Sequence, residues 1–166
     1  MKRLGSAQMD FRQLDRGELL AAVGGILLGI SVFLAWYSLG NSEQNGHNLV
    51  SLNSCRGPGS CSGWHALTIL RFLLLLAALA PVILAWIIIR GHALSWPRGE
   101  LTAVTALAAL TFTLFRGVID RPGTPPGQIS IDFGWWVALL GGLLILIGSI
   151  WRSRESAARR KPPGVL

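Results

Sequence analysis

The sequence predicts an all-α integral membrane protein, a transmembrane four-helix bundle with both termini in the cytoplasm. Of the 166 residues, 51% are hydrophobic and only 14% are charged, which is too apolar for an ordinary soluble domain. Four apolar segments each have about 20 residues, the length that an α-helix needs to cross about 30 Å of hydrocarbon. Cationic residues flank these segments mainly on one side of the predicted membrane.

The four spans are predicted to be helices, because the apolar runs are continuous and lack the alternation of a lipid-facing barrel. The first run is longer than the apolar region of a signal peptide, so we expect this helix to stay attached. The expected organisation is a basic N-terminal segment at 1–18, helices at about 19–39, 64–89, 101–119 and 133–151, outer loops at 40–63 and 120–132, an inner loop at 90–100, and a basic, disordered tail at 152–166.

Positive charge sets the predicted orientation. Four cationic residues precede the first span, two lie between the second and third, and five follow the fourth, which is eleven of the fifteen Lys and Arg residues. We therefore expect a multi-pass protein of the plasma (cytoplasmic) membrane with both termini cytoplasmic. The net charge of +7 then faces anionic lipid headgroups at the cytoplasmic face. Nucleic acid is not expected as a partner, because the cations flank apolar blocks and do not line one surface.

Aromatic residues gather near the predicted helix ends, as is typical of side chains that anchor a protein at the membrane–water interface. The predicted anchors are Trp36, Tyr37, Trp64, Trp135 and Trp136 at the outer ends, and Trp86 and Trp151 at the inner ends.

Cys55 and Cys61 are the two cysteines of the chain, and both fall in the first predicted outer loop. This loop would lie in an oxidising compartment, and the intervening Arg-Gly-Pro-Gly-Ser can turn tightly enough for the two residues to meet. The sequence therefore predicts a structural disulfide, worth about 2 kcal/mol for so small a ring.

Arg71 is a charged residue within the second predicted span, seven positions from its outer Trp64 end. An arginine at such a depth needs a partner or a path for water. Arg116 and Asp120 lie one turn apart near the outer end of the third span, and Asp132 directly precedes the fourth. We expect these four charged residues to form a polar cluster. The cluster is either a clamp that fixes the helix register or a site for an anionic group such as a lipid phosphate.

No sequence pattern predicts catalysis, a metal site or a cofactor. His47, His65 and His92 fall in or beside three different loops and are not expected to converge on one metal ion. No carboxylate lies near the middle of a predicted span, where a proton-coupled transporter usually needs one.

Small residues recur at every fourth position on three spans, which favours close packing of helices in lipid. The stripes are Ala21, Gly25 and Gly29; Thr105, Ala109, Thr113 and Gly117; and Gly134, Ala138 and Gly142. One such face is also a candidate contact for a protein partner or for a second copy of the chain.

These patterns predict a non-enzymatic structural, accessory or partner-binding membrane protein. Two alternatives stay open, namely a small transporter or channel subunit that uses the polar cluster as an anion or polar-solute site, and a membrane enzyme that acts on lipids. A cavity that joins Arg71 to the external side would favour transport, whereas a solid outer half would not.

Three stretches also carry a family resemblance: Arg16-Gly17-Glu18, Phe33-Leu34-Ala35-Trp36-Tyr37, and Phe-Arg-Gly-Val-Ile-Asp-Arg-Pro-Gly at 115–123. Through them the chain resembles an uncharacterised group of small four-helix membrane proteins of high-GC Gram-positive bacteria. The usual form of the second stretch is Phe-Leu-Pro-Trp-Tyr, and Ala35 here replaces the proline. The resemblance implies a four-helix topology and a plasma-membrane location, and it implies no activity.

Overall fold

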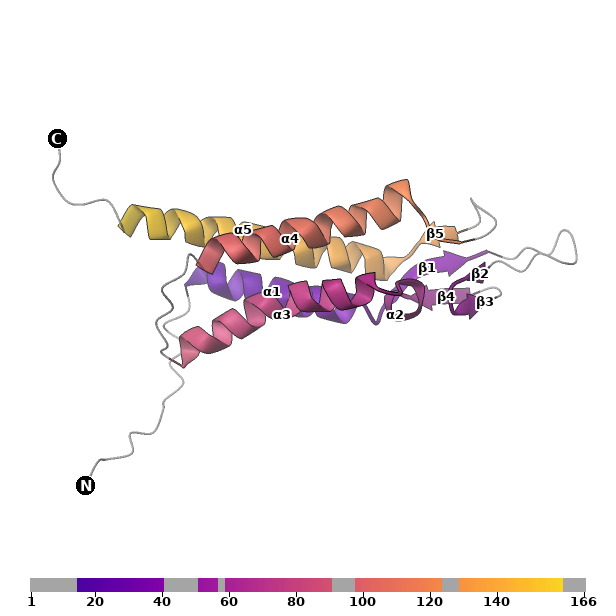
Figure 1. Ribbon diagram of the computed structural model, residues 1–166, viewed down its shortest axis with the longest axis horizontal. Helices are drawn as coiled ribbons and strands as arrows, with labels where there is room; N and C mark the ends of the chain where they lie inside the picture. Colours follow the sequence, from indigo (N-terminus) through magenta and orange to yellow (C-terminus); the bar gives the residue numbers. More distant parts are fainter. Residues whose placement is uncertain (1–14, 41–50, 57–58, 91–97, 124–128, 160–166) are drawn as a thin grey trace, which may run out of the picture.

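The computed structural model describes residues 15–40, 51–56, 59–90, 98–123 and 129–159, and it combines a helical bundle with a small region of strands (Figure 1). The helices are α1 (Arg16–Ser31), the short α2 (Gly63–Ala66), α3 (Leu70–Ile89), α4 (Arg98–Leu114), the π-helical turn η3 (Phe115–Ile119) and α5 (Phe133–Arg159). The strands are β1 (Ala35–Leu39), β2 (Ser51–Leu52), β3 (Cys55–Arg56), β4 (Gly59–Ser62) and β5 (Ile129–Ile131).

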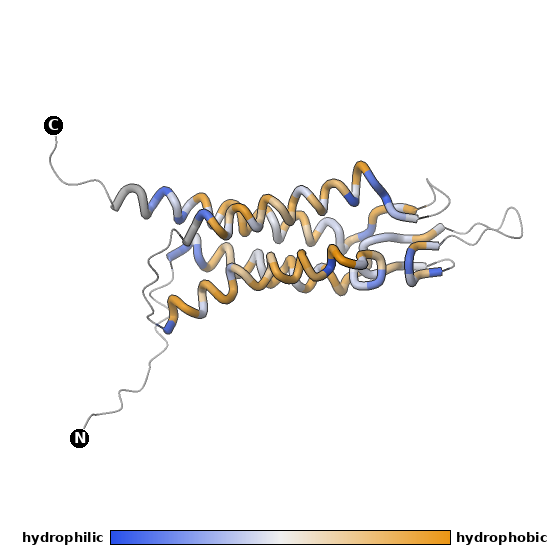
Figure 2. Tube along the Cα trace, viewed as in Figure 1, coloured by the Kyte–Doolittle hydropathy of each residue, from blue (hydrophilic) through white to orange (hydrophobic). Residues whose placement is uncertain are grey.

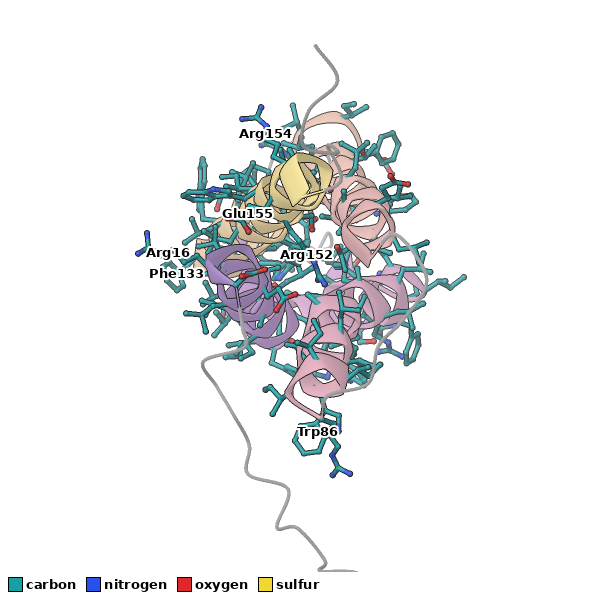
Figure 3. All side chains as sticks on the ribbon, turned by 90° about the vertical axis from the view of Figure 1, so that its left-hand side faces the viewer. Arg16, Trp86, Phe133, Arg152, Arg154 and Glu155 are labelled. Carbon is teal, nitrogen blue, oxygen red and sulfur yellow. A yellow bond between two sulfur atoms is a disulfide. The ribbon has the colours of Figure 1, made fainter. Side chains whose placement is uncertain are left out.

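The four long helices run side by side, and the strands gather at one end of the bundle, which we call the strand end (Figure 1). The opposite end, where α1 begins and α5 ends, is the terminal end. Along the bundle axis, α1 packs between α3 and α5, and α4 packs against α5 and α3 (Figure 3). The predicted N-terminal segment up to residue 14, the predicted inner loop at 91–97 and the tail at 160–166 lie outside the described residues.

Three helical segments are long and apolar enough to cross a membrane, namely Leu70–Ile89, Glu100–Ile119 and Phe133–Glu155. Apolar residues follow the helices along most of their length, and polar residues concentrate near the ends (Figure 2). The helix surfaces are apolar as well, since leucine, isoleucine and phenylalanine side chains on all four long helices are exposed. Exposed apolar faces of this extent are typical of helices that pack against lipid.

The prediction of an all-α fold was wrong, because the strand end contains two small antiparallel sheets. The first sheet has the strand order β4-β1-β5, and the second pairs β2 with β3. These strands use parts of both predicted outer loops together with the last residues of the first predicted span. The fold is therefore not a pure four-helix bundle. It is a helical bundle with a cap, which consists of the sheet β4-β1-β5 and the hairpin β2-β3.

The first predicted helix, 19–39, ends early because its last residues form β1. α1 stops at Ser31, whose hydroxyl donates to the Leu28 carbonyl at 2.6 Å. After a turn, the chain becomes the central strand of the three-stranded sheet, with β4 on one side and β5 on the other. A buried central strand is a continuous apolar run, and hydropathy alone does not separate such a run from the end of a membrane helix.

Other predicted helix boundaries also move. The second predicted helix, 64–89, is split into α2 and α3, because Leu67 is extended with φ −108° and ψ 105°. The third ends in the π-helical turn, in which the Asp120 N–H donates to the Phe115 carbonyl at 2.8 Å. The fourth continues past Trp151 to Arg159, so residues 152–159 of the tail that we expected to be disordered are helical.

The contact between α1 and α5 is a glycine seam with a seven-residue repeat. A β-carbon added to Gly17 would lie 2.7 Å from the Gly148 carbonyl oxygen, and one added to Gly24 would lie 2.7 Å from the Gly141 carbonyl oxygen. The two backbones therefore touch along antiparallel helices. Of the predicted four-residue stripe on α1, Gly25 faces α3, where an added β-carbon would lie 2.5 Å from the Ala78 carbonyl oxygen.

The seam predicts a strong position dependence for glycine-to-alanine substitutions on α1. Gly24→Ala places a methyl group against backbone atoms of α5 that cannot move aside, so we expect a loss of roughly 1–3 kcal/mol. Gly29→Ala is the matched control, because its methyl group meets Ala78 Cβ at an ordinary 3.6 Å and the helix gains about 0.5–1 kcal/mol of intrinsic preference. Thermal unfolding in detergent should show Gly24→Ala melting below the wild type and Gly29→Ala melting at or above it. Equal melting temperatures for the two variants would contradict the seam.

Candidate functional site

The cap at the strand end presents one polar and one apolar sheet face. Ser38 on β1 pairs with Ser60 on β4 and with Ser130 on β5. Residues paired directly across an antiparallel sheet point to the same side, so the three serines form a row. Ser60 and Ser130 are exposed, whereas the neighbouring Tyr37 and Leu39 on the other face are buried.

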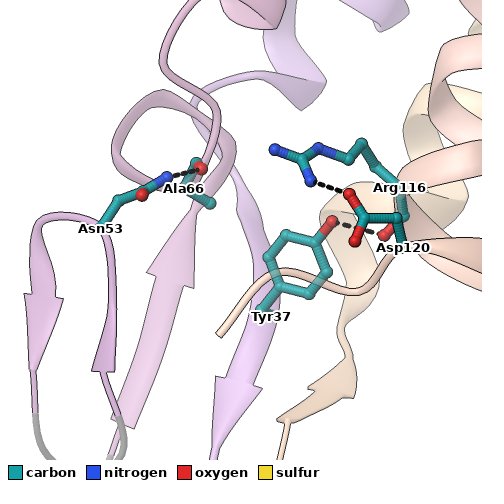
Figure 4. Close-up of polar contacts among 5 residues, drawn as sticks. All are labelled: Tyr37, Asn53, Ala66, Arg116 and Asp120. Carbon is teal, nitrogen blue, oxygen red and sulfur yellow. Dashed lines mark hydrogen bonds and ion pairs between the residues drawn. The ribbon is translucent and has the colours of Figure 1, made fainter. Parts of the chain in front are cut away.

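The cap is joined to the ends of all four long helices, either through the chain itself or through hydrogen bonds. β1 follows α1, and β4 leads through α2 into α3, with the Gly63 N–H donating to the Leu34 carbonyl at 3.0 Å. At the start of α5, the Asp132 N–H donates to the Trp36 carbonyl at 2.8 Å. The Tyr37 hydroxyl donates to the Arg116 carbonyl in η3 at 3.0 Å and so connects the cap to α4 (Figure 4).

Tyr37 acts in this network as a neutral donor. Burial raises the pKa of its hydroxyl from 10.0 to about 12, and the nearby guanidinium groups of Arg116 and Arg121 only partly oppose this shift. The phenol therefore keeps its proton, and the bond to Arg116, at neutral pH.

The predicted disulfide between Cys55 and Cys61 is confirmed, with the two Cα atoms 5.9 Å apart. It joins β3 to β4 and thereby attaches the β2–β3 hairpin to the three-stranded sheet. The hairpin also contacts α2, because Asn53 at its turn donates from Nδ2 to the Ala66 carbonyl at 2.5 Å (Figure 4). Asn53 has φ 49°, a left-handed conformation that asparagine tolerates better than most residues.

The structure brings together two of the four residues of the predicted polar cluster. Arg116 Nη1 and Asp120 Oδ2 form an ion pair at 2.5 Å, one turn apart and partly exposed (Figure 4). Asp132 accepts a hydrogen bond at 2.7 Å from the Phe133 N–H, at the first residue of α5. Arg71 makes neither contact, so the four residues do not share one set of interactions.

Arg71 lies in the first turn of α3, and aromatic rings surround its guanidinium group. Nη1 donates to the Trp64 carbonyl at 2.8 Å, and the guanidinium carbon lies 4.5 Å from the Trp64 ring centroid and 4.8 Å from that of Phe72. Among the residues that the structure describes, no carboxylate lies within ion-pair distance of it. The break between α2 and α3 explains the difference from the sequence, which placed Arg71 seven residues inside one continuous helix.

The predicted aromatic anchors divide into buried and exposed residues. Trp36, Tyr37 and Trp135 are fully or almost fully buried and fill the core at the strand end, instead of facing the interface. Trp36 and Trp135 use their indole N–H groups inside the protein, donating to the Ser31 carbonyl at 2.7 Å and the Thr113 carbonyl at 2.8 Å. The remaining anchors are half-buried or exposed, namely Trp64, Trp86, Trp136 and Trp151.

A second polar site, at the terminal end, was not predicted. Glu18 Oε1 on α1 and Arg152 Nη2 on α5 form an ion pair at 2.8 Å, and their side chains are only 6% and 11% exposed. Figure 3 shows Arg152 directed toward the centre of the bundle, whereas Arg154 points away from it. The pair therefore joins the two helices of the glycine seam.

Hydroxyl groups and a small cavity lie beside this ion pair. Ser149 donates to the Ile145 carbonyl at 2.7 Å, and its oxygen lies 2.9 Å from Thr102 Oγ1 on α4. The cavity has a volume of about 10 Å³, and its lining includes Thr102 and Ser149 together with Glu18 and Arg152. This volume has room for at most one water molecule.

A signal for this site is present in the sequence. Ile145, Gly148, Ser149 and Arg152 recur at the spacing of one helix face, which carries small residues toward the neighbouring helices. Arg152 was expected to be a flanking cation that faces the cytoplasm. Its side chain instead lies on the face of α5 that points into the bundle.

The described residues contain no group of three or more His, Cys, Asp and Glu side chains that could hold a metal ion. The His65 ring nitrogen Nδ1 lies 3.0 Å from the Ser62 hydroxyl. His47 and His92 lie outside the described residues.

The buried ion pair predicts a large effect of neutralising one partner. Arg152→Met leaves the Glu18 carboxylate buried without its counter-ion, which should cost about 3–5 kcal/mol. The double variant Glu18→Gln/Arg152→Met should recover most of that loss, because no buried charge then remains. Arg154→Gln is the control on the same helix and should change stability by no more than about 0.5 kcal/mol. Thermal unfolding in detergent measures all three, and a double variant as unstable as Arg152→Met would argue against a direct pair.

A comparison of the chain with known protein families, with curated proteins and with solved structures finds no match. The resemblance carried by the three short stretches of sequence therefore stays a prediction.

Proposed function

We propose that the chain is a non-enzymatic plasma-membrane protein that crosses the bilayer four times, with both termini in the cytoplasm, and that its cap binds a partner outside the cytoplasm. The observation that carries this proposal is the attachment of all four helix ends to one disulfide-linked cap. Such a cap holds its exposed surface in a fixed position relative to the membrane.

The packing of α1 supports a fourth span. With 16 residues, α1 is about 24 Å long, shorter than the three segments named above. It nevertheless packs along α5 from Gly148 to Gly141, inside the apolar segment of that helix. Its exposed side chains Leu19, Val23, Ile26 and Ile30 form one apolar stripe, as expected for a face toward lipid.

Charge and redox chemistry support the orientation. The terminal end holds the exposed residues Arg16, Arg90 and Arg154, and cationic residues favour the cytoplasmic side, where they also meet anionic lipid headgroups. The strand end holds the Cys55–Cys61 disulfide, which persists in an oxidising compartment.

The filled core at the strand end supports display and not transport. Trp36, Tyr37, Leu67 and Trp135 occupy the centre of the bundle beneath the cap, each at most 4% exposed. These large side chains take the place that a solute path from Arg71 would need. Arg71 itself packs against Trp64 and Phe72 and shares no contact with Arg116, which pairs with Asp120.

The exposed face of the cap indicates the chemistry of the partner. The serine row of Ser60, Ser38 and Ser130 carries hydroxyl groups and no charge. We infer that the partner presents hydrogen-bonding groups, such as a protein backbone or amide side chains, rather than a highly charged surface.

The proposed orientation predicts the accessibility of engineered cysteines. In whole cells, an impermeant maleimide should label cysteine at Ser130 on the cap and should not label cysteine at Arg154 until the membrane is opened. The native Cys55–Cys61 pair should stay unlabelled unless a reductant is added. Labelling of both sites from outside, or of Arg154→Cys alone, would contradict the topology.

Photo-crosslinking tests the function of the cap. A photo-reactive amino acid at Ser60 or Ser130 should give one discrete protein adduct in living cells, whereas the same group at Ile147 on the exposed face of α5 should give lipid adducts. Purified protein in liposomes should not raise the flux of anions or polar solutes above that of empty liposomes. Solute flux that disappears in Arg71→Gln, together with an absence of adducts from the cap, would instead support a transporter.

A further inference from the structure

We propose that Arg71, Trp64 and Phe72 form a binding site for the phosphate group of a membrane lipid in the leaflet at the strand end. This inference rests on the membrane-spanning arrangement proposed above, but not on the orientation or on the partner of the cap.

The guanidinium group of Arg71 is held in a fixed position. The Trp64 carbonyl accepts from Nη1 at 2.8 Å, and the Trp64 and Phe72 rings lie 4.5 Å and 4.8 Å from the guanidinium carbon. Phe33 stacks on Trp64 with the ring centroids 5.4 Å apart and so helps to hold that ring in place. The planar cation is therefore already positioned, so a ligand loses little affinity in ordering it.

The positive charge of Arg71 is not balanced by a carboxylate of the described residues. Among the described residues no carboxylate pairs with Arg71, and its Nε–H is buried without an acceptor. The aromatic faces attract the cation but carry no net charge that neutralises it. The protein thus supplies position but no counter-ion, and an anionic oxygen is the natural partner of a guanidinium group.

The position of Arg71 along α3 indicates its depth in a bilayer. Arg71 and Arg90 lie at the two ends of α3, nineteen residues apart, which corresponds to about 28 Å of helix. This distance matches the hydrocarbon thickness of a bilayer, about 30 Å. Arg90 also lies over a tryptophan, with its guanidinium carbon 4.8 Å from the Trp86 ring centroid. Both arginines therefore lie at the edges of the hydrocarbon, from which a long side chain can reach the lipid phosphates.

The surface around Arg71 is apolar and exposed. Phe72 is 54% exposed, and Ile69 and Leu76 on neighbouring turns are also exposed. A lipid whose phosphate contacts Arg71 can thus lay its acyl chains along the apolar face of α3. Arg116 and Arg121 offer no equivalent site, because Arg116 pairs with Asp120, and Arg121 donates to the Gly117 carbonyl at 2.8 Å and has no aromatic ring of the described part of the chain against it.

Chemical protection of the wild-type protein tests the site. p-Hydroxyphenylglyoxal modifies accessible arginines, and peptide mass spectrometry gives the rate at Arg71 in delipidated protein. We expect phosphatidylglycerol to slow modification of Arg71 about tenfold, the factor for one charge-assisted contact. Diacylglycerol with the same chains should have no such effect, because it lacks the phosphate. Arg121 in the same sample is the internal control and should change less than twofold.

Inorganic phosphate separates the two sources of the anion. At the concentration at which phosphatidylglycerol protects Arg71, inorganic phosphate should leave the rate unchanged, because it has no chains to pack on Phe72. Equal protection by inorganic phosphate would overturn the assignment to a lipid, and no protection by phosphatidylglycerol would overturn the site itself. Cysteine labelling reports the topology independently, so a failure of this site and a failure of the membrane arrangement give different results.

Arg71→Lys gives a second measurement that does not depend on the reagent. Lysine keeps the charge but loses the planar stacking on the two rings. Native mass spectrometry should therefore show several-fold fewer protein molecules that retain phosphatidylglycerol, with Arg121→Lys as the matched control. Retention equal to the wild type in Arg71→Lys would contradict a stacked guanidinium site.

Discussion

The close contact between α1 and α5 is the interaction on which the rest of the structure depends. In lipid, apolar side chains gain nothing by leaving the solvent, so helices associate through packing and polar contacts. Gly17 and Gly24 let the backbone of α1 approach that of α5 at Gly148 and Gly141. This contact forms the centre of the bundle, since α3 packs on the other side of α1 and α4 packs on α5. Large apolar side chains are consequently left exposed on the outside of the bundle, as is typical of helices that pack against lipid.

The backbone of the cap lies beyond the helices, so its polar groups need hydrogen-bond partners other than those within a helix. Strand pairing satisfies the polar groups of β1 on both edges, and the buried Trp36 and Tyr37 close the bundle beneath the sheet. The disulfide attaches a hairpin of two-residue strands that has little core of its own. The tightly packed cap supports a surface for recognition more readily than a path for solutes.

The sequence predicted the features that depend on local composition. Apolar length located α3, α4 and α5, and two cysteines six residues apart located the disulfide. Strand pairing could not be predicted, because it joins β1 to residues about 25 and 90 positions later, and the apolar run of β1 fits a helix equally well. The seven-residue glycine repeat was also missed, since a four-residue period describes only one turn of contact.

The polar contacts also divide into local ones, which the sequence can predict, and long-range ones, which it cannot. Arg116 and Asp120 form an ion pair across one helix turn, a local relation that is visible in their sequence spacing. Arg71 could not be placed, because the chain leaves the helix between Ala66 and Leu70, and nothing in the hydropathy marks that break. Glu18 and Arg152 lie at opposite ends of the sequence, so no local spacing predicts their ion pair, and Arg152 was counted only as a flanking cation.

The two ends of the bundle together fix a register that the glycines leave open. A slide of α1 by seven residues would place Gly24 beside Gly148, so the glycine repeat alone fits more than one alignment. That slide would separate Glu18 from Arg152 and leave two buried charges without their partners, which is strongly unfavourable. It would also pull β1 out of pairing with β5 at the opposite end. The ion pair and the sheet therefore specify the alignment, while the glycines supply the close packing.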